Sequence, residues 1–269
     1  MIAFPFCKIN LGLSILSKRT DGFHSIETCF YPVPWTDILE IIPSDEFVFT
    51  TSGISIEGNL STNLCVRAYA LLQTEFNLPP VSIHLHKIIP MGAGLGGGSS
   101  DAAFTLLLLN QVFELKLSIE HLKRYASQLG SDCSFFLENK PQLGEGKGEE
   151  LSHAAVDLEN KFLVIVKPDI HVSTQEAYAG VNAKSSQKTI KELVENQALP
   201  EWKNHLINDF EESVFKKFPV ISDIKKSLYA KGATYASMSG SGSSVFGIFE
   251  KPVDLKSSFS GYTYWSGLL

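Results

Sequence analysis

The stretch of residues 90–101 constrains the fold of this chain more than any other, because a glycine run joins two apolar elements there. Five of the 20 glycines in the sequence lie within it. A strand-like run (81–89) precedes it, and a strongly helical pattern (102–113) follows it. Glycines keep side chains away, so that successive backbone N–H groups can converge on an anion. The following helix adds its unpaired N-terminal N–H groups and the positive end of its dipole, so the stretch predicts a phosphate-binding loop.

Three other interpretations of this glycine run fit the sequence less well. Gly92, Gly94 and Gly97 fit the dinucleotide-binding pattern, but that pattern needs a second strand ending in an acidic residue, and residues 114–128 read as helix. A P-loop requires a lysine after its last glycine, and the run contains none. A flexible linker would be polar on both sides, whereas this run is flanked by apolar elements.

Near the N-terminus, apolar and polar residues alternate with a period of two, which predicts a half-buried strand. One face holds Cys7, Ile9, Leu11, Leu13 and Ile15, and the other holds Lys8, Asn10, Gly12 and Ser14. The alternation alone favours an ordinary solvated lysine at position 8, because lysines are mostly exposed.

A second candidate for chemistry is Asp132, which stands just after a predicted helix that Ser118 caps and Gly130 ends. Apolar residues follow it almost at once. A carboxylate in that position is either partly desolvated, which suits catalysis, or caps a short helix. The pattern leaves both interpretations open. By contrast, His84 and His86 share one strand face without a third ligand nearby, which favours a solvent-facing pair over a metal site.

Composition excludes several classes of function. The net charge of −6 and the pI of about 5.7 argue against a nucleic-acid or anionic-membrane binder. The four cysteines (Cys7, Cys29, Cys65 and Cys133) are scattered, which predicts free thiols in a reducing cytoplasm. No signal peptide is apparent, and no apolar run is long enough to span a bilayer.

The order of the predicted elements indicates an α+β protein with two domains, 1–156 and 157–269. Residues 1–60 read mostly as strands. After a composition shift near residue 156, strands and helices alternate again, and a second small-residue loop (237–244) joins two strands.

With these features in place, residues 90–102 resemble the ATP-binding signature of the GHMP kinases, a superfamily of small-molecule kinases. Further motifs occur in family order: Lys8-Ile9-Asn10-Leu11, Asp21-Gly22-Phe23-His24, Gly130-Ser131-Asp132-Cys133-Ser134-Phe135-Phe136, Val172-Ser173-Thr174 with Tyr178, Asn208-Asp209-Phe210-Glu211, and Met238-Ser239-Gly240-Ser241-Gly242. The resemblance implies a two-domain GHMP kinase fold, with a ribosomal-protein-S5-domain-2-like N-terminal domain and a ferredoxin-like C-terminal domain.

Within that superfamily, the motifs resemble those of members that phosphorylate the 2-hydroxyl of 4-diphosphocytidyl-2-C-methyl-D-erythritol in non-mevalonate isoprenoid precursor biosynthesis. The resemblance implies ATP as co-substrate, Mg²⁺, and Lys8 and Asp132 as the catalytic pair. Asp132 would accept the proton of the substrate hydroxyl, while Lys8 would keep Asp132 ionised and offset charge on the phosphate. The implied partner is this small cytidine diphosphate compound, and the implied assembly is a monomer or weak homodimer.

The resemblance also implies the binding residues. The ATP phosphates would lie on Pro90, Met91, Gly92, Ala93, Gly94, Leu95, Gly96, Gly97, Gly98, Ser99 and Ser100, with Gly240 and Gly242 closing the site. Ser99 or Ser100 would reach the magnesium ion. Phe23 and Tyr178 would sandwich the cytosine ring while His24 reads its edge by hydrogen bonding. Asn10 and Thr174 would contact the polar erythritol-diphosphate part.

The sequence departs from the family pattern at a few positions. Phe23 stands where a tyrosine is frequent, Ala179 stands where some members have a lysine, and Cys133-Ser134 replaces a hydrophobic-proline pair. Two alternatives remain: a GHMP kinase for homoserine, mevalonate or a sugar, and a catalytically silent nucleotide-binding module. The aromatic pair beside His24 favours a pyrimidine substrate over those alternatives.

Overall fold

The structure is a computed structural model that describes residues 1–56, 58–181 and 188–269. Its contacts divide the chain into two compact units, each built from discontinuous segments. Unit 1 comprises Met1–Cys7, Trp35–Met91 and Gly96–Asn139, and unit 2 comprises Lys8–Pro34, Gly92–Leu95 and Lys140–Leu269. Both units combine strands with helices, which confirms the predicted α+β class. The continuous division at residue 156 stays a prediction.

Unit 1 contains a four-stranded sheet in the order β1 (Ile2–Ala3), β4 (Ile38–Pro43), β6 (Val81–Lys87) and β5 (Val48–Gly53). The pairing of β5 with β6 is parallel and the others are antiparallel. Alternate residues of β6 are buried, from Val81 to Lys87, so one face of the sheet meets the core.

The opposite face of this sheet carries His84 and His86. Thr50 Oγ1 lies 2.8 Å from Nδ1 of His84, and Ser52 Oγ lies 2.9 Å from a ring nitrogen of each histidine. Within the described part of the chain, no group of three or more His, Cys, Asp or Glu side chains is placed to hold a metal ion. Both histidines are therefore bonded to hydroxyl groups of the neighbouring strand β5.

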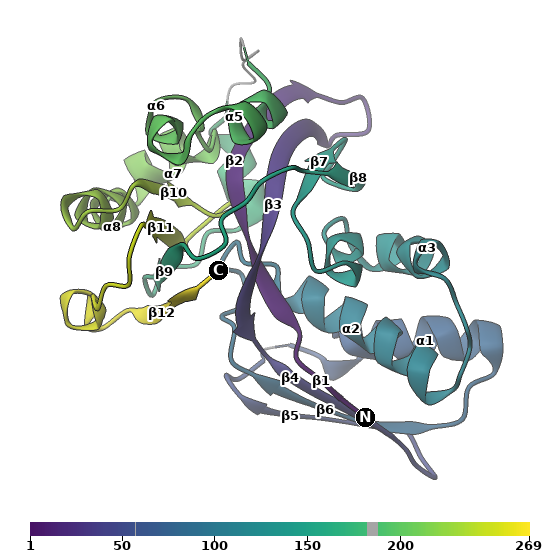
Figure 1. Cartoon of the computed structure of the whole chain (residues 1–269). Coiled ribbons are helices and arrows are strands. Elements are labelled where there is room, and N and C mark those ends of the chain that lie inside the picture. Colours follow the sequence, from purple (N-terminus) through teal and green to yellow (C-terminus); the bar gives the residue numbers. More distant parts are fainter. Residues whose placement is uncertain (57, 182–187) are drawn as a thin grey trace. The chain divides into compact units, whose positions relative to one another are not determined.

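The helices of unit 1 cover the buried face of the sheet (Figure 1). They are α1 (Leu64–Phe76), α2 (Gly97–Val112) and α3 (Ile119–Leu129), with the 3₁₀ turns η1 (Leu60–Thr62) and η2 (Cys133–Leu137). Helix α2 packs against α1, α3 and β4, and its residues Ala102, Leu106 and Leu109 are fully buried. This confirms the predicted central helix, but α2 begins at Gly97 and not at Ala102.

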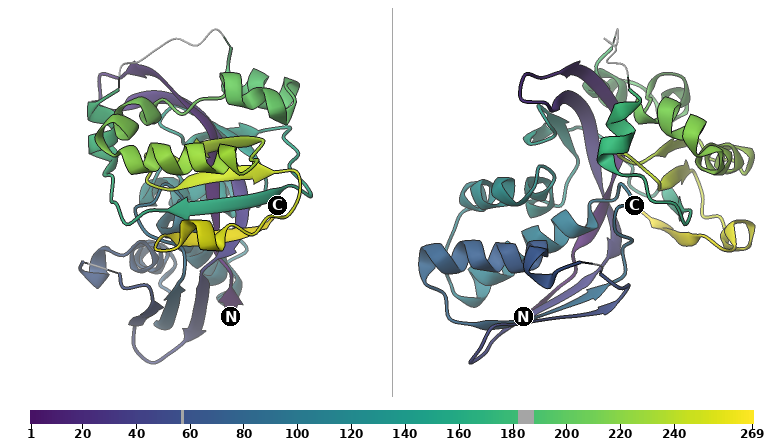
Figure 2. Two further views of the ribbon diagram at one scale, coloured as in Figure 1. Left: turned by 90° about the vertical axis from the view of Figure 1, so that its left-hand side faces the viewer. Right: turned by 180° about the vertical axis from the view of Figure 1, so that it is seen from behind.

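Unit 2 contains two sheets. The first sheet has the order β2 (Phe6–Lys18), β3 (His24–Thr36), β7 (Gln142–Glu145) and β8 (Glu150–His153). The second sheet is wholly antiparallel and has the order β10 (Tyr235–Met238), β11 (Val245–Phe249), β9 (Phe162–Lys167) and β12 (Thr263–Leu268). Figure 2 shows β9 between two yellow strands in its left view. The first two residues of β2 and the last two of β3 belong to unit 1.

The helices of unit 2 are short. They are α4 (Thr174–Ala179), α5 (Ile190–Asn196), α6 (Trp202–His205), α7 (Phe210–Lys217) and α8 (Pro219–Ala230), with the 3₁₀ turns η3 (Leu199–Glu201) and η4 (Lys256–Phe259). Helix α8 packs on β10 and β11, and its Ile221 is buried in the same core as Val164 and Val245.

All four cysteines are buried free thiols, as predicted. A search of the helices in the described residues finds none with the length and apolarity needed to cross a membrane.

Candidate active site

Lys8 lies in a buried network of unit 2 and is only 3% exposed. Its ammonium donates to Asn10 Oδ1 at 2.5 Å and to Gly94 O at 2.9 Å, and it stands 5.3 Å from the centroid of the Phe30 ring. Strand β2 is buried on both faces from Phe6 to Leu13, so the predicted half-buried strand with a solvated lysine is wrong. The reason is tertiary: side chains and backbone from distant segments cover the polar face.

Asn10 belongs to the same network. Its Oδ1 accepts from Lys8, and its Nδ2 donates to Thr28 Oγ1 at 2.9 Å. Thr28 in turn donates to Gly12 O at 2.6 Å. The carboxamide thus orients the lysine, and its predicted contact with the substrate stays a prediction.

The glycine run adopts conformations that favour glycine. Gly92, Gly94 and Gly96 have φ values of +58°, +77° and +70°. A Cβ on Gly94 would lie 1.9 Å from Ser239 O, so no other residue fits there. Gly96 caps α2 without a side-chain hydrogen bond, which leaves the first N–H groups of that helix to an anion or to solvent.

The start of α2 also places buried polar groups beside this uncapped helix end. Ser100 is fully buried, and its Oγ has no hydrogen-bond partner among the residues that the structure describes. Asp101 is 3% exposed, and its Oδ2 accepts from Lys87 Nζ at 2.7 Å. Lys87 also pairs with Asp37, whose Oδ1 accepts the backbone N–H of Ile88 and of Ile89.

These three side chains form a buried triad that the sequence analysis missed. Burial raises the pKa of Asp101 to about 7; the charge of Asp37 acts in the same direction and that of Lys87 opposes it. Burial alone would lower the pKa of Lys87, but the two carboxylates raise it above its usual value. A signal was present, because Lys87 shares the parity of the buried residues Val81, Ile83 and Leu85 in β6.

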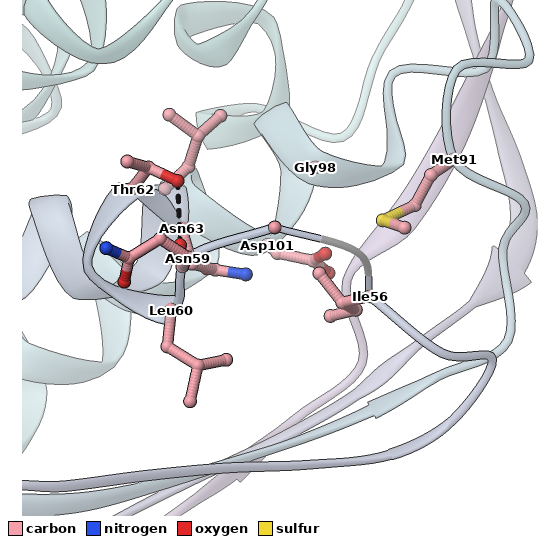
Figure 3. Close-up of a pocket in the computed structure, with 10 residues that line it drawn as sticks. Ile56, Asn59, Leu60, Thr62, Asn63, Met91, Gly98 and Asp101 are labelled. Carbon is pink, nitrogen blue, oxygen red and sulfur yellow. Dashed lines mark hydrogen bonds between the residues drawn. The ribbon is translucent and has the colours of Figure 1, made fainter.

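A pocket of about 200 Å³ adjoins the start of α2 in unit 1 (Figure 3). Leu60, Asn63, Met91, Gly98 and Asp101 are among its lining residues. Pockets for whole drug-sized ligands are usually larger, so this volume suits a single ring system. Of these residues only Met91 and Gly98 were predicted to bind ATP; nothing in the pattern around η1 marked that turn as part of a pocket.

Asp132 lies in unit 1, in the N-cap position of η2, but its side chain makes no capping hydrogen bond. Ser131 Oγ donates to its Oδ1 at 3.3 Å. The residues that follow anchor the segment, because Phe135 and Phe136 are both buried. The Phe135 ring packs edge-on against Phe6 and against Phe136. The helix-capping interpretation of Asp132 therefore does not hold, and the carboxylate sits on a rigid support. Lys8 and Asp132 belong to different units.

The residues predicted to hold the cytosine ring lie in unit 2. The His24 ring stacks on Tyr178, with centroids 4.5 Å apart and planes 14° apart, and Phe210 meets Tyr178 edge-on. Phe23 is 59% exposed, and Lys147 Nζ stands 5.1 Å from its ring centroid. A sandwich between Phe23 and Tyr178 therefore requires His24 to leave its stacked position.

The remaining predicted positions are Thr174, Gly240 and Gly242. Thr174 is the exposed first residue of α4. Gly240 and Gly242 lie in the turn between β10 and β11, with φ values of +54° and +89°. Ser99 lies in the first turn of α2 and is half-buried.

Comparison with known proteins adds three findings. The model of the GHMP kinases N terminal domain matches residues 63–139, and that of the GHMP kinases C terminal domain matches residues 179–257. The 4-diphosphocytidyl-2-C-methyl-D-erythritol kinase of Cytophaga hutchinsonii is 56% identical over 93% of this chain and 92% of its own length. The kinase of the same name from Parabacteroides distasonis is 48% identical over the full length of both chains.

A crystal structure described as 4-(cytidine 5'-diphospho)-2C-methyl-D-erythritol kinase superposes with a TM-score of 0.85 at 31% identity, covering 99% of this chain and 98% of its own. A Streptococcus pneumoniae phosphomevalonate kinase shares the fold at 13% identity, with a TM-score of 0.74 and full coverage of both chains.

Proposed function

The chain belongs to the GHMP kinases, and from this membership we propose that it transfers the γ-phosphate of ATP to the 2-hydroxyl of 4-diphosphocytidyl-2-C-methyl-D-erythritol. The observation that carries the choice of substrate is the identity of 48–56% with kinases of that name over nearly the whole chain. Tyr178 and the exposed Phe23 support it, because a pyrimidine ring can stack between aromatic side chains once His24 leaves its position on Tyr178.

For ATP, the proposal assigns the phosphates to the glycine run and the N-terminal amides of α2. The neighbouring pocket at Asn63 and Met91 would take the adenine ring, since it is sized for one ring system and adjoins the anion-binding helix end. For Mg²⁺, the hydroxyl of Ser100 is the proposed protein ligand, because its buried Oγ has no hydrogen-bond partner in the described part of the chain. When bound, the ion would neutralise charge on the β- and γ-phosphates.

The catalytic roles proposed for Lys8 and Asp132 follow from their chemistry. Asp132 accepts the proton of the attacking 2-hydroxyl while the γ-phosphoryl group moves to that oxygen and ADP leaves. The ammonium of Lys8, held by Asn10 Oδ1 and Gly94 O, offsets the negative charge that builds up during the transfer. We also propose that the enzyme works in the cytoplasm as a monomer or weak homodimer.

An ADP-release assay tests the substrate directly. The chain is offered the cytidine compound, homoserine, mevalonate and a sugar in turn, and only the cytidine compound is expected to give turnover. The residue assignment is tested with Asp132→Asn, for which we expect a loss of turnover on the order of 10²-fold or more with ATP binding retained. The exposed Asp45→Asn in the same unit serves as the control. Undiminished turnover in Asp132→Asn would favour an accessory role for this carboxylate, and no turnover with the cytidine compound would reject the proposed substrate.

A further inference from the structure

Asn208 belongs to a motif that the proposed reaction leaves unused. It lies between α6 and α7 and is fully buried. The backbone on either side of it pairs with the middle of β2: Leu13 N donates to Ile207 O at 2.9 Å, and Asp209 N donates to Leu13 O at 2.8 Å. The segment is thus fixed to the strand that carries Lys8.

The carboxamide of Asn208 binds the turn between β10 and β11. Its Nδ2 donates to Met238 O and to Gly240 O, both at 2.8 Å, and its Oδ1 accepts from Phe210 N at 3.0 Å. A primary amide has two N–H donors and a carbonyl acceptor, so every polar group of this side chain is used on the backbone. Serine would offer the turn a single donor and aspartate would offer it none.

Ser239 stands between the two carbonyl groups that Asn208 binds. Its Oγ donates to Gly94 O at 2.9 Å and accepts from Asn10 N at 3.3 Å. Gly94 O and Asn10 Oδ1 both accept from Lys8 Nζ. A continuous set of buried and partly buried hydrogen bonds therefore leads from Asn208 through the turn to the ammonium group.

The same contacts set the direction of the turn's own amides. In a trans peptide the N–H points opposite to the C=O. With Gly240 O turned toward Asn208, the following N–H, that of Ser241, points away from it. Gly240 itself has a positive φ of 54°, and a carbonyl held by a donor keeps the turn in that conformation.

We infer that Asn208 is a positioning residue of the phosphoryl-transfer site. Its two N–H donors fix the turn at Ser239, and Ser239 with Gly94 O fixes the ammonium of Lys8. The inference rests on the proposed function only for the role of Lys8 in catalysis; the placement of Lys8 by Asn208 is a separate claim. Misplacing a catalytic group by about 1 Å can lower the rate about 10²-fold, so Asn208→Ser is expected to lower kcat by about 10- to 100-fold.

The test compares Asn208→Ser with Ile221→Ala, which removes a fully buried side chain from the core of the same unit. Lysines are labelled with carbon-13 at Cε, and Lys8→Arg identifies the Lys8 signal in the NMR spectrum. We expect this signal to shift in Asn208→Ser and to stay in place in Ile221→Ala. The fall in kcat per folded molecule is expected in Asn208→Ser alone.

An unshifted Lys8 signal together with an unchanged kcat per folded molecule overturns the inference, because Asn208 would then contribute to stability alone. If the chain phosphorylates no cytidine compound, the proposed function fails, while the Lys8 signal still decides the placement. If Asn208→Ser does not fold, Ser239→Ala breaks the same path at the next hydrogen bond, and an unshifted Lys8 signal in that variant counts equally against the inference.

Discussion

Replacing Asp101 with asparagine should change how the stability of the protein depends on pH. Asp101, Asp37 and Lys87 form a buried group of two carboxylates and one ammonium, whose net charge is −1 when all three are ionised. Burial raises the pKa of Asp101 to about 7 from an ordinary value of 3.8. The folded protein therefore keeps a proton on this carboxyl group through a pH range in which the unfolded chain has lost it.

The sign and size of the effect follow from proton linkage. Between about pH 4 and pH 7 the folded state binds more protons than the unfolded state, so the free energy of unfolding falls as the pH rises. A difference of about 3 pKa units corresponds to about 4 kcal/mol, fully expressed above pH 7 and absent below pH 4. About two units of this pH range, from pH 5 to pH 7, fall within the interval from pH 5 to pH 8. The free energy of unfolding should therefore change by about 3 kcal/mol over that interval.

Urea denaturation of the wild type, Asp101→Asn and the exposed control Asp45→Asn at half-unit steps from pH 5 to pH 8 measures this effect. Other titrating groups cancel in the difference between the wild type and each variant. Relative to that of Asp101→Asn, the free energy of unfolding of the wild type should fall by about 3 kcal/mol from pH 5 to pH 8, while that of Asp45→Asn should follow the wild type. Parallel curves for the wild type and Asp101→Asn would refute the reasoning.

Three further variants test the binding residues and the glycine run. Tyr178→Ala removes the ring on which His24 stacks, and it should raise KM for the cytidine substrate about 10-fold while KM for ATP stays within a factor of two. Equal changes in both KM values would argue against a role of Tyr178 in binding the base. Gly98 lies in the first turn of α2, with open space for a Cβ among the described residues. Gly98→Ala should raise the free energy of unfolding by at most about 1 kcal/mol and weaken ATP binding in calorimetry. Gly94→Ala should lower stability, because its Cβ would lie 1.9 Å from Ser239 O. Unchanged ATP binding in Gly98→Ala would remove this residue from the nucleotide site.

The local features of the fold could be predicted from the sequence because they depend on neighbouring residues. Ser118 caps α3 by accepting from His121 N, as predicted, and Gly130 follows the end of that helix. Asn63 caps α1 through a similar local hydrogen bond, and Asn77 ends α1 in the left-handed conformation. The family and the order of the elements could also be predicted, because several family motifs occur in order along the sequence. These predictions require no knowledge of tertiary contacts.

Relations between distant residues were not predictable in the same way. Asp37 and Lys87 are 50 positions apart, and neither shows in its own surroundings that it has a charged partner. The burial of Lys8 depends in part on Gly94, 86 positions away, and alternation along β2 reports only one face of the strand. The parity of Lys87 with buried residues was informative only because β6 is half-buried throughout, a condition that β2 does not meet.

The glycine run illustrates how one sequence signal combines separate physical causes. Gly94 is required because Ser239 O approaches its backbone, and Gly97 because a Cβ there would lie 2.9 Å from Lys87 Nζ and 3.0 Å from Ile89. Both causes act within the protein, with no ligand involved. Among the described residues Gly98 has no such neighbour, and it lines the pocket beside α2. In a helix, alanine would be more stable there by about 1 kcal/mol, so a glycine at this position is best explained by something that must approach the backbone closely. Of these three glycines, Gly98 is therefore the one whose presence argues for a bound nucleotide.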